Sequence, residues 1–160
     1  MLTVSFTILG DVAMMRAFSR YGDAVKDYRK VWDQIKADFH RIETEQFDSL
    51  GGRSGVPWQQ LSPDYEAWKM RNYPGQPLMR LTGQMWGQFA MGIGMNVMSE
   101  PLRLRIGPPS MRYPVYHQQG SFKTNLPMRK VVALTEPDKT GWVKMIHNYI
   151  YDKAKEAHLA

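Results

Sequence analysis

The feature that most constrains the fold is a long amphipathic stripe in the first third of the chain. Apolar residues recur there at alternating steps of three and four, at Val25, Tyr28, Trp32, Ile35, Phe39 and Ile42. This spacing places them on one face of an α-helix. The sequence therefore predicts one continuous helix from Asp23 to about Ser49, roughly 40 Å long at 1.5 Å per residue. Its apolar face is expected to cover either the chain's own sheet or, in part, a neighbouring subunit.

Shorter patterns predict the other elements. Strands are expected at 2–9, at 91–106 as an antiparallel hairpin and at 129–134, and helices at 12–21, 63–71, 82–90 and from Thr135 onward. The helix at 63–71 is expected to have Ser62 as its cap and Pro63 at its first position. Gly22 is expected to end the first of these helices, and Gly92 and Gly94 are interpreted as strand glycines. Thr135 and Asp138 have the spacing of a capping box, and an apolar face follows it from Trp142 to Lys153.

These elements predict an α+β fold: a small antiparallel or mixed sheet, with the long helix and a C-terminal helix packed on it. The 160 residues fit a single domain, 1–160. Within it, the glycine-rich stretch at about 50–61 is expected to form a flexible loop with little structure of its own.

Composition excludes several classes of protein. With 43% hydrophobic and 22% charged residues, the chain is expected to fold rather than remain disordered. The sequence has no apolar run of 18 residues and no signal-peptide pattern at its start, so neither a membrane protein nor a secreted one is expected. The absence of cysteine excludes disulfides and cysteine-ligated metals.

The residues also give little support for catalysis. The four histidines are scattered, and no metalloprotease, P-loop or nucleophile-elbow motif is present. His40 and Glu43 lie one helical turn apart and could share a metal, but a surface pair is the favoured interpretation because a third ligand is missing. We therefore expect a protein that is not an enzyme and that uses no cofactor or metal.

Four segments, in order, carry a resemblance to a known family. They are Gly55 to Tyr65 (GVPWQQLSPDY), Leu78 to Met85 (LMRLTGQM), Arg105 to Gly107 followed by Tyr113 to Gly120 (RIG, YPVYHQQG), and Leu126 to Arg129 (LPMR). They resemble the patterns G-x-x-W-x-x-L-S, I-L-x-x-T-G-x-L, I-G with Y-A-x-x-H-Q-F-G, and I-P-A-R of the phage virion morphogenesis family. That family includes the Mu-like G protein and the S-type tail-completion proteins. The resemblance spans most of the chain from Gly55 onward.

The resemblance implies a structural protein in the neck or tail of a tailed bacteriophage, assembled in the host cytoplasm. Such a protein completes the tail or joins it to the head, as a tail-completion, terminator or neck protein. Its expected partners are copies of itself in a homo-oligomeric ring, with a hexamer as one candidate size, and the tail tube, terminator or connector. No membrane partner is expected. Rings of this kind need heterologous interfaces that close by rotation.

Several residues of the matching segments are candidate contacts with a neighbouring subunit or partner. They are Trp58, Leu61, Tyr65, Tyr113, Tyr116, His117, Gln118, Gly120 and Arg129. Trp58 could fill a pocket on a neighbour as an interface hot spot, or it could join its loop to the chain's own core. For the segment from Tyr113 to Gly120, a local role in a turn at the sheet edge is favoured over partner contact.

Positive charge suggests a rival function. The net charge is +6, and the segment between Glu100 and Lys130 is strongly basic. Arg103 and Arg105 share one face of the expected hairpin, and in a ring they could line a channel for passing DNA or face acidic neighbours. The alternative to a virion protein is a basic nucleic-acid-binding domain that acts as a monomer or dimer.

Overall fold

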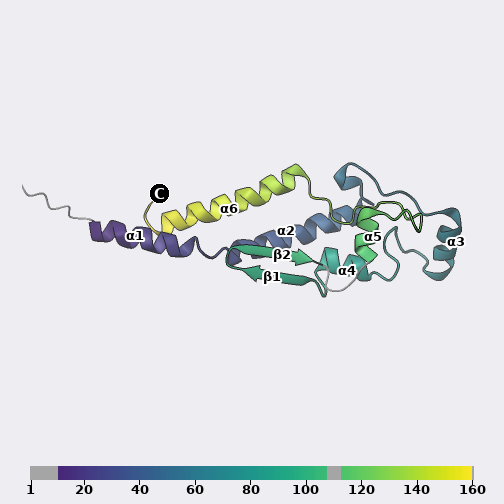
Figure 1. Cartoon of the computed structure of the whole chain (residues 1–160), viewed down its shortest axis with the longest axis horizontal. Coiled ribbons are helices and arrows are strands. Elements are labelled where there is room, and N and C mark those ends of the chain that lie inside the picture. The colour runs from purple at the N-terminus through teal and green to yellow at the C-terminus, as the bar shows by residue number, and fades with distance from the viewer. Residues whose placement is uncertain (1–10, 108–112, 160) are drawn as a thin grey trace, which may run out of the picture.

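The computed structural model describes residues 11–107 and 113–159, so the strand expected at 2–9 lies outside the described residues. The elements run in the order α1 (Asp11–Ala24), α2 (Arg29–Asp48), the short 3₁₀-helix η1 (Gly52–Ser54), α3 (Pro63–Asn72), α4 (Gln84–Met91), β1 (Asn96–Glu100), β2 (Arg103–Gly107), α5 (Tyr113–Gln119) and α6 (Glu136–Glu156). The mixed α+β class is the one that the sequence predicts. The described part is elongated, with α1 at one end and α3 at the other (Figure 1).

The long helix expected from Asp23 to Ser49 is interrupted near its start. Gly22 does not end the preceding helix, because α1 continues to Ala24, and α2 begins only at Arg29. The Asp27 carboxylate accepts the backbone N–H of Arg29 at 3.0 Å, a local bond that competes with helical hydrogen bonding. Tyr28 donates its own N–H to Pro101 O at 2.8 Å, so the backbone at this point is held by the hairpin instead.

The core lies between α2 and α4, with connecting segments closing it. The buried cluster consists of Phe39, Phe47, Trp58, Leu78, Met85, Phe89 and Val131. The predicted stripe on α2 is confirmed where it is fully buried, at Ile35, Phe39 and Ile42. Since the same chain covers these residues, this part of the stripe is not available to a neighbouring subunit.

The predicted hairpin is confirmed as a two-stranded antiparallel sheet, with Val97 opposite Ile106. It begins later than expected because the glycines before it are not strand residues. Gly92 and Gly94 both have φ of 70°, and Gly92 ends α4 in the left-handed conformation. The turn of the hairpin is fixed to α2, since the Trp32 indole donates to Glu100 O at 2.8 Å.

The strand expected at 129–134 does not form. The backbone there is bonded by a side chain and not by a neighbouring strand. Gln118 Oε1 accepts hydrogen bonds from the N–H groups of Val131 and Val132 at 2.9 and 3.0 Å. Gln118 Nε2 in turn donates to Val132 O at 2.9 Å. Val131 is buried at 1% exposure, so this segment packs into the core without forming a strand.

The glycine-rich segment after α2 carries more structure than expected. It contains η1, and Trp58 donates its backbone N–H to Leu50 O at 2.8 Å, which closes the loop on itself. Gly51 has φ of 85°, and a Cβ there would lie 2.5 Å from the Trp58 ring, so only glycine fits beneath the indole. Arg53 extends from this loop and forms an ion pair with Asp138 at the start of α6.

The last helix begins as predicted, with a capping box. Asp138 accepts hydrogen bonds from the N–H and the hydroxyl of Thr135, both at 2.7 Å. These bonds and the Arg53 ion pair hold the pKa of Asp138 well below its ordinary value, the Arg53 bond being the largest cause. The apolar face of α6 meets α2 and α1 but stays only half-buried at Trp142 and Tyr149.

Glu43 is buried, which contradicts the interpretation of His40 and Glu43 as a surface pair. Its side chain is 0% exposed, and neither carboxylate oxygen has a hydrogen-bond partner among the described residues. Burial raises the pKa of Glu43 to about 8, although the charge of Arg53 acts in the opposite direction. His40 instead bonds Phe89 O at 2.8 Å through Nδ1.

The raised pKa of Glu43 makes the stability of the protein dependent on pH. In the unfolded chain this carboxyl ionises near its ordinary value of 4.5, whereas in the folded protein it keeps its proton up to about pH 8. Between these values the folded state binds more protons, so the free energy of unfolding falls as the pH rises. We expect Glu43→Gln to flatten this fall, with a gain of a few kcal/mol at pH 8, at roughly 1.4 kcal/mol per pKa unit.

Urea denaturation of both proteins from pH 4.5 to 8.5 measures this effect. Glu45→Gln is the matched control, because Glu45 lies two residues away on the exposed side of α2, paired with Arg41 and Arg53. It should leave the downward slope in place. Equal slopes for the wild type and Glu43→Gln would contradict the role given to Glu43.

Candidate functional site

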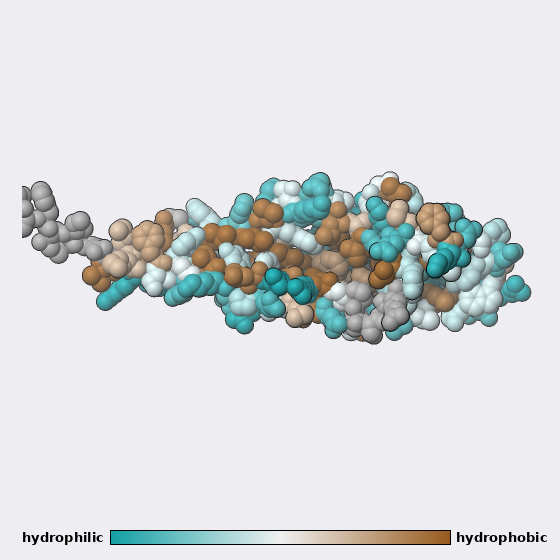
Figure 2. Space-filling view, in the orientation of Figure 1, coloured by the Kyte–Doolittle hydropathy of each residue, from teal (hydrophilic) through white to brown (hydrophobic). Residues whose placement is uncertain are grey.

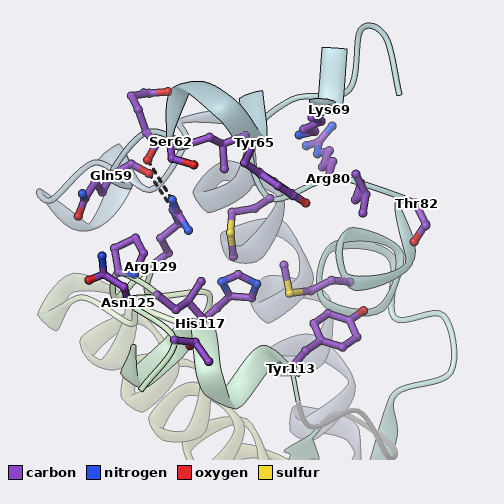
Figure 3. Close-up of a pocket in the computed structure, with 18 of the residues that line it drawn as sticks. Gln59, Ser62, Tyr65, Lys69, Arg80, Thr82, Tyr113, His117, Asn125 and Arg129 are labelled. Atoms are coloured by element: carbon purple, nitrogen blue, oxygen red, sulfur yellow. Dashed lines mark hydrogen bonds between the residues drawn. The ribbon is translucent and has the colours of Figure 1, made fainter. Parts of the chain in front are cut away.

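A cavity of about 970 Å³ lies at the α3 end of the molecule, between four segments that are distant in sequence. Its walls come from the approach to α3, the segment before α4, the helix α5 and the loop after α5 (Figure 3). Of the candidate contact residues, the structure brings Leu61, Tyr65, Tyr113, His117 and Arg129 together here. The described lining contains no aspartate or glutamate.

The first wall depends on where α3 begins. Pro63 occupies the first turn, where its missing N–H removes no helical bond, and Ser62 stands at the N-cap position. Ser62 makes no side-chain capping bond, which differs from the expected use of its hydroxyl and leaves that group on the cavity wall. Leu61 and Tyr65, one on each side of this start, both line the cavity.

The opposite wall is helix α5, where the sequence predicts a turn at the sheet edge. The segment Tyr113–Gln119 is helical instead, and Tyr113 and His117 at i and i+4 share the face that lines the cavity. Tyr116 lies elsewhere on the helix and is 53% exposed. Gly120 ends the helix with φ of 73°, where a Cβ would lie 3.1 Å from Leu126 O, so its role is local and structural.

Arg129 has the most unusual environment in the cavity. Its side chain is 4% exposed, and its guanidinium donates from Nε to Gln59 O at 2.7 Å and from Nη2 to Gln60 O at 3.0 Å (Figure 3). Both acceptors are neutral carbonyls, and no ion pair joins Arg129 to a carboxylate of the described residues. Burial lowers the pKa of Arg129 as a result. The cavity therefore contains a buried positive charge without a counter-charge.

His117 lies close enough to feel that charge. Burial, and then the charge of Arg129, lower the pKa of His117 below its ordinary value, so the ring is neutral at neutral pH. Its Nδ1 is buried and has no hydrogen-bond partner in the described part of the chain. No carboxylate or hydroxyl of the described residues bonds His117 Nδ1, so the orienting partner that a catalytic base normally has is not found among them.

Two further cations line the cavity that the sequence did not indicate as site residues. Lys69 is buried on α3 and donates to Pro77 O, and burial lowers its pKa. Arg80 pairs with Asp48 at 2.6 Å, and its guanidinium lies 4.6 Å from the centre of the Trp86 ring. Both side chains are thus already engaged, and Arg80 has a carboxylate partner that Arg129 lacks. Arg80 belongs to the motif segment Leu78 to Met85, so the sequence could have indicated it as a site residue. Its packing against Trp86 could not be predicted from the sequence.

Trp58 lies in the core and not on a contact surface. Its ring is packed edge-on against Phe47 with centroids 5.3 Å apart, and the indole N–H donates to Lys130 O at 2.8 Å. At 4% exposure it is not available to a neighbour. Two roles were considered for Trp58, and the structure supports the second: Trp58 joins its loop to the chain's own core.

Arg103 and Arg105 lie away from the cavity, on the exposed face of β2, with Leu104 and Ile106 half-buried between and beside them. The alternation predicted for this strand is therefore confirmed. Glu100 stands directly opposite Arg103 in the register, so this face is of mixed charge.

The described residues contain no group of three or more histidine or acidic side chains placed to hold a metal ion. No helix among them is long and apolar enough to span a bilayer. Arg129 and Lys69, which have no carboxylate partner among the described residues, together with tyrosine hydroxyls and apolar walls, give the cavity the groups needed to bind an anion beside an apolar body.

Comparison with known proteins found no matching family model, no matching curated protein and no matching solved structure.

Trp58 and Trp68 differ in exposure, so we expect their replacement by alanine to have different effects on the free energy of unfolding. Trp58→Ala removes a buried ring and the bond to Lys130 O, and we expect a loss of about 3–5 kcal/mol in the free energy of unfolding. Trp68→Ala, at 41% exposure on α3, is the matched control and should change it by less than about 1 kcal/mol. Chemical denaturation of both variants checks this, and equal losses would argue against the core position of Trp58.

Proposed function

We propose that this chain is a structural virion protein of a tailed bacteriophage, which completes the tail or joins it to the head and works by oligomerisation rather than catalysis. The four motif segments that resemble the phage virion morphogenesis family support the class of protein. The observation that supports oligomerisation is the exposed apolar face of α1.

Within residues 11–107 and 113–159, little of the chain covers helix α1. Met14, Met15 and Phe18 are 55%, 62% and 55% exposed, and Phe18 lies one turn from both methionines. Ala17 is buried, at 7% exposure, while the helix projects toward one end of the molecule (Figure 1). Figure 2 shows this apolar surface continuing from α1 over the middle of the visible face, between α6 and the hairpin. An exposed apolar surface of this kind is typical of a protein interaction site.

A different apolar surface lies at the other end of the molecule, on α3. Tyr65 and Trp68 stack with ring centroids 5.3 Å apart, Trp68 also meets Tyr73, and Met70 is 69% exposed. Exposed aromatic residues of this kind are enriched at interface hot spots. Two unlike surfaces at opposite ends of an elongated subunit suit heterologous contacts, which close into a ring when the rotation permits. A homo-oligomeric ring in the neck or tail, in contact with tail tube, terminator or connector proteins, fits this arrangement.

The alternative, a nucleic-acid-binding domain, has weaker support. Arg103 and Arg105 are exposed on β2, but Glu100 opposite Arg103 and the exposed Met98 opposite Arg105 make the face mixed. Non-specific DNA binding requires several free cations along a continuous track. Contact with DNA passing through a ring remains compatible with these two arginines.

We expect Phe18→Glu to prevent oligomerisation while the monomer stays folded, because the new charge would be buried at the contact. Ser19→Glu is the matched control: it adds the same charge at the next, exposed position of α1. Size-exclusion chromatography with light scattering should give a tenfold or larger loss of subunit affinity for Phe18→Glu, about 1.4 kcal/mol or more, and little change for Ser19→Glu.

Complementation of a phage that lacks the chain extends this test to the particle. Phe18→Glu should give fewer joined, infectious particles than Ser19→Glu. A wild-type chain that is strictly monomeric at high concentration and with tail components, and that binds DNA tightly with a steep dependence on salt, would favour the nucleic-acid alternative.

A further inference from the structure

The buried charge of Arg129 has no counterpart within the described chain. Three features make its environment unusual: the side chain is 4% exposed, its guanidinium donates to the neutral carbonyls of Gln59 and Gln60, and no acidic side chain belongs to the described lining of the cavity. Burying a cation without a counter-charge costs free energy, which a bound anion would offset. Arg53, in the same half of the molecule, has two carboxylate partners, Glu45 and Asp138.

The geometry points to a binding site for a carboxylate of an acidic, partly apolar peptide segment, supplied by a partner protein and seated at Arg129. Nε and Nη2 are occupied by Gln59 O and Gln60 O, and Nη1 makes no hydrogen bond to residues 11–107 or 113–159. A carboxylate at this remaining nitrogen would form a charge-assisted hydrogen bond. The tyrosine rings of Tyr65 and Tyr113 flank the same space (Figure 3).

The cationic groups of the lining favour a carboxylate over a phosphate backbone. Arg80 is paired with Asp48, whereas Lys69, like Arg129, bonds only a neutral carbonyl, so the described lining has two cations without a carboxylate partner. Single-stranded nucleic acid is usually held by a run of free cations and stacking platforms. Two such cations make no continuous run, and of the two Arg129 has a guanidinium nitrogen, Nη1, that makes no hydrogen bond to the described residues.

The apolar part of the lining favours a peptide over a bare anion. Leu61, Met79, Met85, Leu126 and Pro127 supply apolar surface next to Arg129. Side chains that flank an acidic residue in a peptide would cover this surface, and methionine adapts well to varied partners. Asn125 stands at the rim on the Arg129 side of the cavity (Figure 3). The carboxylate site depends neither on α1 nor on a role in the virion.

The test uses two blocked synthetic pentapeptides, Ala-Leu-Glu-Leu-Ala and the same peptide with Gln in place of Glu, added to the full chain. Two-dimensional NMR follows the Arg129 Nε–H signal and the His117 ring. We expect the Glu peptide to shift both signals and to bind at least about tenfold more tightly than the Gln peptide. Equal binding of the two peptides, or no shift with either at millimolar concentration, would overturn the proposal.

Binding should also change the titration of His117. The charge of Arg129 helps to lower the pKa of His117, so a bound carboxylate that offsets this charge should raise it. The other ionisable groups that line the cavity are Tyr65, Lys69, Arg80 and Tyr113. Because the Gln peptide carries no charge, it should not raise the pKa of His117, and any burial of the ring by that peptide would lower it. A rise with both peptides would therefore not come from a carboxylate and would count against a carboxylate at Arg129.

Asn125→Asp tests the position of the site without altering the buried arginine. This isosteric change places a negative charge at the rim beside Arg129 and should weaken the Glu peptide severalfold. Asn148→Asp, the same change at an exposed position of α6, is the matched control and should have no effect. Inorganic phosphate or a short single-stranded DNA that displaces the Glu peptide at lower concentration than free acetate would assign the site to phosphate instead.

Discussion

The crossing of two short segments, residues 58–60 and 129–131, determines most of the structure around the cavity. The Lys130 carbonyl accepts both the Trp58 indole N–H at 2.8 Å and the Gln46 side-chain amide at 3.0 Å, and the Arg129 guanidinium bonds the carbonyls of Gln59 and Gln60. The carbonyls of Gln59, Gln60 and Lys130 are thus satisfied by side chains and not by a sheet, as buried polar groups require. Because Trp58 is also part of the hydrophobic core, the wall of the cavity is continuous with the core.

The same crossing explains why two arginines of this region differ. Arg53 reaches across to Asp138 and Glu45, and the carboxyl groups of both have their pKa lowered by it. Arg129 is held by carbonyls alone, which position the guanidinium firmly but leave its charge uncompensated. A positioned side chain with an unpaired charge is preorganised for a ligand, since little rotamer entropy is lost on binding. The contrast therefore separates an internal structural ion pair from a candidate binding group.

Local patterns in the sequence predicted the elements whose cause is local. The stripe on α2, the start of α3 and the capping box of α6 follow from residues within a few positions of one another. Asp27 is a residue type that can interrupt a helix by bonding nearby backbone, as it does before α2, but the continuous apolar stripe led to the prediction of an unbroken helix. The absence of a strand at 129–134 was not predictable, because the partner of its backbone is the side chain of Gln118, a residue from another segment. For the same reason the candidate contact residues could be named from motifs, but their meeting in one cavity could not.

The positions of the two surfaces also bear on how copies of the chain could associate. Helix α1 contributes little to the core, so its apolar face can change partners without disturbing the packing of α2 and α4. The aromatic surface on α3, in contrast, adjoins the cavity wall at Tyr65, so contacts there would be felt by Arg129 and His117. A two-fold dimer would pair like surfaces and leave the other end of each subunit uncovered, whereas a head-to-tail contact uses both. In that arrangement each subunit would present two interfaces, the apolar face of α1 and the aromatic surface on α3, which adjoins the proposed carboxylate site. A partner's acidic segment bound at that site would then influence the strength of the ring contact on α3.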